Sequence, residues 1–207
     1  MESPWIKDAV SLRGRKIEVC PLERASLDAL FAVAQDPNIW RLTSVDYSVR
    51  ENFYSNFEAA IRGREKGTSW PLIIRLVDSA QIIGTTRLLE ISPEDRKLEI
   101  GVTWLATQYW GSGANTECKY LLLEYCFETL KANRVQFRAK SDNARSRRAL
   151  EKIGATFEGV FRKDKIEPGG EARNTAFYSI INDEWTDLKP RLAAKLRLLP
   201  LAKGAEL

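Results

Sequence analysis

The stretch from Leu98 to Lys131 constrains the fold most, because its residue pattern changes period within a few positions. The first part alternates, with Leu98, Ile100, Val102 and Trp104 on one side and Glu99, Gly101, Thr103 and Leu105 on the other. This alternation predicts a strand over 98–105. A short loop with two glycines, Gly111 and Gly113, comes next. Apolar residues then recur at helical spacing from Ala114 to Leu130, which predicts a long helix.

A strand that passes through a glycine turn into a helix is suited to hold a phosphate. The first N–H groups of a helix lack partners within the helix and lie at its positive end, and glycines let a ligand approach that backbone. The loop is not of the nucleotide-triphosphate type, because Ala114 and Asn115 follow Gly113 where Lys and then Ser or Thr are required. A dinucleotide loop fits poorly, since Thr116 occupies the place of its third glycine.

Composition indicates an ordinary globular chain. Its 207 residues are 44% hydrophobic and 29% charged, which is enough for one domain with a substantial core. The net charge of +4 favours anionic ligands slightly, but no basic run is interleaved with aromatic residues, so we expect no nucleic-acid partner. No run reaches the ~18 apolar residues of a membrane span. Residues 1–15 lack the apolar core of a signal peptide, so we expect a cytoplasmic protein without a membrane partner.

Histidine is absent and cysteine is scarce. Without histidine there is no His-based catalytic triad and no His-ligated metal, and the three scattered cysteines do not have zinc-site spacing, so we expect no metal. Cys118 and Cys126 would lie about 12 Å apart along one helix, at ~1.5 Å per residue, which is too far for a disulfide. A reducing compartment is the simplest setting for such a chain.

The order of the predicted elements indicates one α/β domain with a mixed sheet and helices on both faces. Strands are expected at 16–22, 70–77, 81–91, 98–105, 134–140, 156–166 and 174–181. Helices are expected at 26–35, 48–65, about 114–131, 143–153 and 183 to about 192, where Pro190 limits the last helix. We expect residues 1–14 to form an N-terminal lead-in, 15–192 the domain, and 193–207 a basic C-terminal tail.

Three short motifs resemble the GNAT superfamily of acyl-CoA N-acyltransferases. They are Glu99-Ile100-Gly101, Tyr109-Trp110-Gly111 and Asn115-Thr116-Glu117, and they look like the ribosomal-protein N-terminal acetyltransferase (RimJ/RimL-type) branch. The segments Asn143–Ser146 and Gly154–Gly159 match too, in the family's order. The resemblance covers about 17–192. It implies a central, mostly antiparallel sheet in which the strands at 98–105 and 134–140 splay apart to admit a pantetheine arm.

The resemblance also implies acetyl-CoA as the co-substrate. Its pyrophosphate would lie on the amides of residues 110–115, with Arg145 and Arg148 near the nucleotide phosphates and Asn143 near a pantetheine amide. The expected cofactor-binding residues are Trp104, Leu105, Gln108, Trp110, Gly111, Ser112, Gly113, Ala114, Asn115, Asn143, Arg145 and Arg148. A plain strand–helix turn is the alternative for the glycines, and a solvated basic face is the alternative for the arginines.

Acetyl transfer to an amine needs a group that accepts a proton, because a primary amine is protonated at neutral pH. Glu99 is the candidate base; the alternative is a structural ion pair with a neighbouring Lys or Arg. Backbone N–H groups of residues 102–105 would stabilise the oxyanion if Gly101 marks a bulge. The tyrosine that many relatives use as an acid is absent between Lys140 and Phe157. Ser146, the nearest hydroxyl, is the candidate acid, although the thiolate leaves easily without one.

The expected activity is transfer of an acetyl group to a primary amine by direct attack in a ternary complex. The acceptor is a protein N-terminus or a small-molecule amine, and no charge pattern in the sequence selects between them. Trp40 and Trp70 are candidate walls of its pocket, although large aromatics are more often core residues. A homodimer is compatible with the resemblance. The alternative function is a non-catalytic acyl-CoA-binding or regulatory protein with the same fold.

Overall fold

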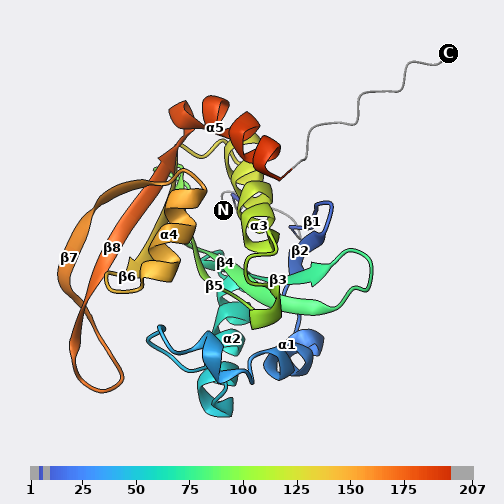
Figure 1. The fold of residues 1–207 in the computed structure, drawn as a ribbon, viewed down its shortest axis with the longest axis vertical. Helices are drawn as coiled ribbons and strands as arrows, with labels where there is room; N and C mark the ends of the chain where they lie inside the picture. The colour runs from blue at the N-terminus through green and yellow to red at the C-terminus, as the bar shows by residue number, and fades with distance from the viewer. Residues whose placement is uncertain (1–4, 7–9, 197–207) are drawn as a thin grey trace.

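The computed structural model describes residues 5–6 and 10–196, and an eight-stranded sheet runs through their centre (Figure 1). Its strand order is β1-β2-β3-β4-β5-β6-β8-β7. The strands are β1 Leu12–Arg13, β2 Ile17–Pro21, β3 Ser69–Leu76, β4 Ile82–Ser92, β5 Lys97–Leu105, β6 Arg134–Lys140, β7 Thr156–Ile166 and β8 Ala172–Ile181. The β5–β6 pair is parallel and the other neighbours are antiparallel. The expected mixed, mostly antiparallel sheet is therefore confirmed.

Helices cover both faces of this sheet. They are α1 Leu27–Val33, α2 Arg50–Glu65, α3 Ala114–Glu124, α4 Ala144–Lys152 and α5 Asn182–Lys195, and α3 continues into a π-helical turn at Tyr125–Thr129. Strand β3 shows the two layers, because Leu72 and Ile74 join the core under α3 and α5 while Ile73 joins the core under α1 and α2. In Figure 1 the α1–α2 pair lies apart from α3, α4 and α5. None of the described helices has the length and apolarity needed to cross a bilayer.

Strands β5 and β6 separate after a short parallel contact. They pair over Lys97–Glu99 and Arg134–Gln136, yet β5 continues to Leu105 and β6 to Lys140. The backbone groups beyond the paired part are therefore available to a ligand that enters between the strands. The expected splay is confirmed.

A bulge in β5 lies at Val102, which has a φ of 48°. The β4–β5 register shifts between Thr85 and Arg87, opposite this position. A bulge adds one residue and reverses the alternation of side chains after it. Leu105 therefore shares a core with Leu98, whereas Trp104 packs in the opposite layer. The expectation of a bulge near Gly101 is confirmed, and the expected placement of Trp104 beside Leu98 is wrong.

The first and last described segments pack on the core. Ile6 and Val10, in the expected lead-in, are buried in the main core, and Trp5 Nε1 donates to Leu130 O at 2.9 Å. Helix α5 continues past Pro190 to Lys195, because Leu188 and Leu192 anchor it to the core on both sides of the proline. The helix thus extends beyond Leu192, and Pro190 does not end it. Most of the predicted tail, from residue 197 onward, lies outside the described residues.

Candidate active site

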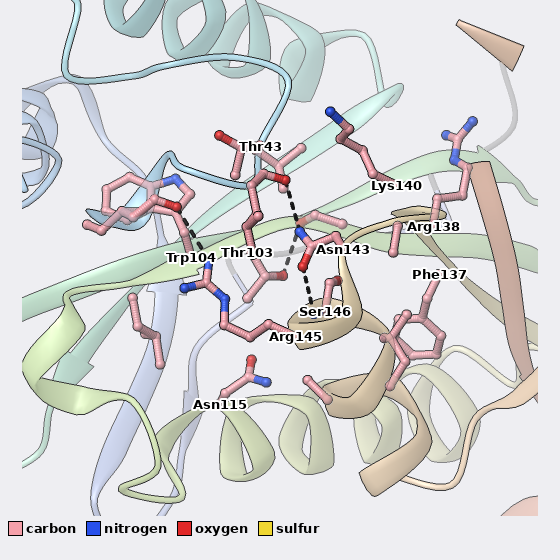
Figure 2. A pocket seen from close by; sticks show the side chains of 18 of the residues that line it. Thr43, Thr103, Trp104, Asn115, Phe137, Arg138, Lys140, Asn143, Arg145 and Ser146 are labelled. Atoms are coloured by element: carbon pink, nitrogen blue, oxygen red, sulfur yellow. Dashed lines mark hydrogen bonds between the residues drawn. The ribbon is translucent and has the colours of Figure 1, made fainter. Parts of the chain in front are cut away.

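A cavity of about 510 Å³ opens between β5 and β6 and extends over the loop before α3 (Figure 2). Its walls come from the 39–47 loop, the second half of β5, the 109–113 loop, the first turns of α3, the end of β6 and one face of α4. This volume lies within the usual range for small-molecule sites. The predicted site residues along the cavity are Trp40, Trp104, Leu105, Trp110, Gly111, Gly113, Asn115, Asn143, Arg145 and Ser146.

The remaining predicted site residues lie outside the cavity wall. Gln108, Ser112 and Arg148 are exposed, and Ala114 is buried behind the loop. Trp70 is buried in the main core, because β3 is an interior strand with both faces covered. The expectation that Trp70 lines an acceptor pocket is therefore wrong. Glu99 is also absent from the wall, although it lies directly behind it.

The glycine loop presents free backbone donors at the start of α3. Gly111 and Gly113 have φ of 76° and 92°, the left-handed region that favours glycine. Among the described residues, the amides of Gly111 and Gly113 have no hydrogen-bond partner, whereas the Ala114 amide donates to Ser112 Oγ at 3.2 Å. Helix α3 has eleven residues, so its N-terminal dipole adds to these donors. The loop can accept an anion without rearrangement of its hydrogen bonds.

Arg145 is held beside this loop. Its Cζ lies 3.9 Å from the centroid of the Trp110 ring, and its guanidinium donates to Ile39 O at 3.5 Å. Trp110 in turn donates from Nε1 to Leu105 O at 3.0 Å. Stacking on an indole orients a guanidinium and leaves its edge free for an anion. Arg145 is therefore the arginine of α4 that belongs to the cavity, since Arg148 is exposed on another face of the helix.

Asn143 uses its side chain within the protein. Its Oδ1 accepts from Ser146 N at 2.9 Å and caps α4, and its Nδ2 donates to Leu42 O at 3.0 Å. Both bonds are drawn in Figure 2, beside the hydroxyl of Ser146. The Asn143 amide thus ties the 39–47 loop to the start of α4 and positions Ser146 along the cavity.

Glu99 lies on the side of the sheet opposite α3. It is 4% exposed, and its Oε2 is 2.5 Å from Arg138 Nε and accepts from Gln136 Nε2 at 3.2 Å. Its Oε1 is so close to Gly101 that a Cβ added there would come within 2.8 Å of it. Burial raises the pKa of Glu99, and the charge of Arg138 opposes this shift. Glu99 thus contacts Gly101 and Arg138, two residues that line the cavity.

Lys119 is a cavity residue that the sequence pattern misses. Its spacing in α3 indicates a polar face, yet it is 4% exposed and lines the cavity. Its Nζ donates to Thr103 Oγ1 at 2.7 Å, and that hydroxyl is 2.8 Å from Thr86 Oγ1. Burial lowers the pKa of Lys119 to about 8. No local signal marks it, because α3 is buried on nearly all sides between the sheet and α5.

Two tryptophans line the other wall. Trp40 donates from Nε1 to Ala34 O at 2.7 Å, and its ring meets the Trp104 ring edge-on at 5.1 Å. Trp104 Nε1 is buried without a hydrogen-bond partner among the described residues. An unpaired buried N–H is costly, so it is a donor that a ligand in the cavity can satisfy. The expected place of Trp40 along the cavity agrees with the structure.

Comparisons with known proteins agree with this architecture. Residues 16–156, more than half of the chain, match the family model described as acetyltransferase (GNAT) domain. The provisionally named ribosomal N-acetyltransferase YdaF of Bacillus subtilis (strain 168) is 34% identical over 110 residues, which cover 53% of this chain and 59% of YdaF. The chain thus spans less than two thirds of that relative.

Solved structures match over more of the chain. A provisionally assigned acetyltransferase from T. thermophilus is 37% identical with a TM-score of 0.78, and the match covers 90% of this chain and 96% of that one. Mycobacterium smegmatis RimJ in complex with CoA-disulfide is 21% identical with a TM-score of 0.77 over 95% of this chain and 98% of RimJ, which shows a shared fold. From the family match and the fold together, this protein belongs to the GNAT acetyltransferase family of acyltransferases.

Proposed function

We propose that this protein transfers the acetyl group of acetyl-CoA to a primary amine by direct attack in a ternary complex. One observation carries the proposal: free amides at a helix N-terminus line a cavity in the splay of β5 and β6, and the buried carboxylate of Glu99 contacts Gly101 and Arg138 of the same cavity wall. The first feature suits a pyrophosphate and the second suits proton transfer from an amine. Family membership supports the same chemistry.

Acetyl-CoA would supply an acetyl group activated as a thioester. The amides around Gly111 and Gly113 would hold its pyrophosphate, and Arg145 would balance the charge. The free edges of β5 near Trp104 and Leu105 would receive the pantetheine, together with Asn115. The other predicted cofactor residues would only support this site, because they are exposed, buried behind the loop or already bonded within the protein. They are Gln108, Ser112, Ala114, Asn143 and Arg148.

Glu99 would accept the proton that the attacking amine releases, through one water molecule. In this step a bond forms between the amine nitrogen and the acetyl carbon, the carbon–sulfur bond breaks, and the thiolate keeps the electron pair. Backbone N–H groups after the bulge at Val102 would stabilise the negative charge on the acetyl oxygen. Ser146 could protonate the thiolate, although such a leaving group needs little help.

The acceptor is either a protein N-terminus or a small-molecule amine. The name of YdaF refers to the ribosome, which favours a protein N-terminus as the first acceptor to test. We place the reaction in the cytoplasm, in the domain formed by residues 15–192. The family resemblance also favours a homodimer, which light scattering after size-exclusion chromatography would test.

Calorimetric titration with acetyl-CoA, followed by assays of thiol release with amines and short peptides, tests the proposal. We expect binding, and release with at least one class of acceptor. Binding without release from any acceptor would favour the alternative, a non-catalytic acyl-CoA-binding protein, for which the ion pair of Glu99 with Arg138 is the supporting observation. An absence of binding would contradict both functions.

A further inference from the structure

The charges along the cavity are all of one sign. Among the described residues, its wall includes six cationic side chains and no aspartate or glutamate: Lys119, Arg138, Lys140, Arg145, Lys152 and Arg173. Arg145 lies at the glycine loop and Lys119 lies under β5, so these two belong to the cofactor side. Three of the others, Arg138, Lys140 and Arg173, come from β6 and β8.

These three cations share the sheet face that carries Glu99. Along β6, Val135, Phe137 and Ala139 are buried in the core under α3, so Arg138 and Lys140 point to the opposite face. Lys140 pairs with Thr175 of β8, and Arg173 lies two residues before Thr175 on the same face. Figure 2 shows Lys140 and Arg138 across the pocket from Asn115, which lies in the first turn of α3. This face is where an acceptor amine would meet Glu99.

The carboxylates on this face are shared unevenly among the cations. Arg138 contacts two of them, Glu99 at 2.5 Å and Glu90 at 3.1 Å. Lys140 and Arg173 share one carboxylate, Glu167, at 3.5 Å and 3.2 Å, and Ser44 Oγ also donates to that carboxylate at 2.9 Å. Their side chains are only 24%, 18% and 17% exposed for Lys140, Arg173 and Glu167. Within this group of three residues, two cations therefore share one carboxylate at largely buried positions.

Among the three cations of β6 and β8, Lys140 has the longest ionic contact. Within the part of the chain that the structure describes, its only ionic contact is the one with Glu167, and 3.5 Å is longer than the ~2.7–2.9 Å of a strong charge-assisted hydrogen bond. An ammonium group has three donors, so it retains capacity for an anion in the cavity. A cationic ligand placed there would be repelled by the same surplus charge.

We propose that Lys140 and Arg173 bind an anionic group of the acceptor, so that the preferred acceptor is a primary amine that carries a carboxylate or a phosphate. The inference rests on the proposed acetyl transfer to amines. It specifies a free amino acid, a peptide N-terminus with an acidic side chain, or an amino phosphate. It argues against polyamines and aminoglycosides, because their additional positive charges would face Lys140, Arg173 and Arg138.

Matched acceptor pairs that differ only in the anionic group test the preference. The pairs are an amino acid and its amide, a short peptide with Glu or Gln in second place, and phosphoethanolamine and ethanolamine. For the wild type we expect kcat/KM for thiol release to be about 10- to 100-fold higher for the anionic member of at least one pair, the range of a charge-assisted hydrogen bond. The acceptor pair with the largest ratio of kcat/KM values identifies which kind of acceptor supplies the anionic group. Equal rates within every pair would overturn the inference and leave the proposed function intact.

Variants show whether Lys140 causes the preference. Lys140→Met should bring the ratio close to one by lowering kcat/KM for the anionic acceptors, and Lys140→Arg should keep the ratio. Lys163→Met is the matched control, because Lys163 is exposed on β7 and its replacement removes the same charge. A ratio that survives in Lys140→Met, or falls equally in Lys163→Met, would contradict an anion site at Lys140.

A binding measurement with phosphate tests the anion site independently of acetyl transfer. The protein saturated with CoA is titrated with inorganic phosphate by calorimetry. We expect binding to the wild type that is at least about 10-fold weaker in Lys140→Met. If no amine is acetylated but this difference is found, the proposed function fails and the anion site stands. If phosphate binds both proteins alike, or neither, the anion site is wrong.

Discussion

The two ends of the cavity are built in opposite ways. At the end beside the glycine loop, one continuous stretch from Trp104 to Asn115 supplies most of the wall, and its free donors are backbone amides. At the other end, Ser44, Lys140 and Arg173 come from three distant segments, and Glu167 joins them through its carboxylate. A site made of backbone groups depends on dihedral angles, whereas a site made of side chains depends on their charge and placement. We therefore expect substitutions that change dihedral angles to affect the first end, and substitutions that change charge to affect the second.

The largest effect is expected for Gly113→Val. Gly113 has a φ of 92°, which a β-branched residue avoids, so the loop would turn its amides away from the ligand. We expect about 100-fold weaker binding of acetyl-CoA by calorimetry, the loss of one or two charge-assisted hydrogen bonds. Gly170→Val is the matched control, because Gly170 has a φ of 86° and, like Gly113, open space around its Cβ position. Equal losses in both variants would show that the loop is only a turn.

Glu99→Gln tests the chemical step at the junction of the two ends. We expect kcat to fall about 100-fold, within the range of general-base catalysis, with little change in acetyl-CoA affinity. Since the pKa of Glu99 is raised, wild-type kcat should fall as the pH drops through that pKa and Glu99 becomes protonated. The variant should lack this dependence and recover rate at pH values where the amine loses its proton unaided.

Glu90→Gln is the control for Glu99→Gln. Glu90 also contacts Arg138, at 3.1 Å, but its side chain is 58% exposed, and we expect nearly wild-type turnover. A similar loss in both variants, or a loss in Glu99→Gln that is equal at every pH, would indicate that Glu99 serves to position Arg138.

Lys119→Met should stabilise the fold at neutral pH. The pKa of Lys119 is about 8 in the folded protein and near 10.5 when unfolded, so the unfolded chain binds more protons between these values. The free energy of unfolding therefore rises as the pH increases from about 8 to 10.5, because the folded protein no longer has to bury a charged Lys119. Below about pH 8 the Lys119 ammonium is charged in the folded protein, and burying it has its full destabilising effect. We expect the free energy of unfolding in urea to increase by about 1–3 kcal/mol at pH 7, with a smaller gain at pH 10.

The exposed Lys163 provides the comparison for this stability test, because Lys163→Met removes a charge that is not buried. Its effect should be small and nearly independent of pH. If Lys119→Met destabilises the protein equally at pH 7 and pH 10, the bond to Thr103 outweighs the cost of burial.

The smallest effect is expected for Ser146→Ala. Ser146 lies along the cavity, but its hydroxyl would protonate a thiolate that departs readily. We expect kcat to fall by no more than about threefold, a small effect beside the ~10²-fold or larger effect of an essential acid. Its backbone amide would still donate to Asn143, so α4 should keep its cap. A 100-fold loss would identify Ser146 as the general acid.

Local patterns predict the elements of this fold well. The alternation over 134–140 matches β6 residue for residue, Asn143 caps α4, and the glycines at 111 and 113 precede α3 as expected. These features depend on neighbouring residues in the chain. The side assigned to Trp104 was wrong because the bulge at Val102 reverses the alternation, although Gly101 already marked the place where a bulge fits.

The sequence by itself determined the glycine loop between a strand and a helix, because dihedral preferences and the side-chain period are local properties. The splay of β5 and β6 was expected only from the resemblance to the GNAT family. Only the tertiary structure decided that Lys119 is buried, that Trp70 lies outside the cavity, and that Lys140 and Arg173 share a single carboxylate. Burial and charge balance depend on which distant segments meet, and residues 44, 140, 167 and 173 meet only when the sheet and the 39–47 loop are assembled.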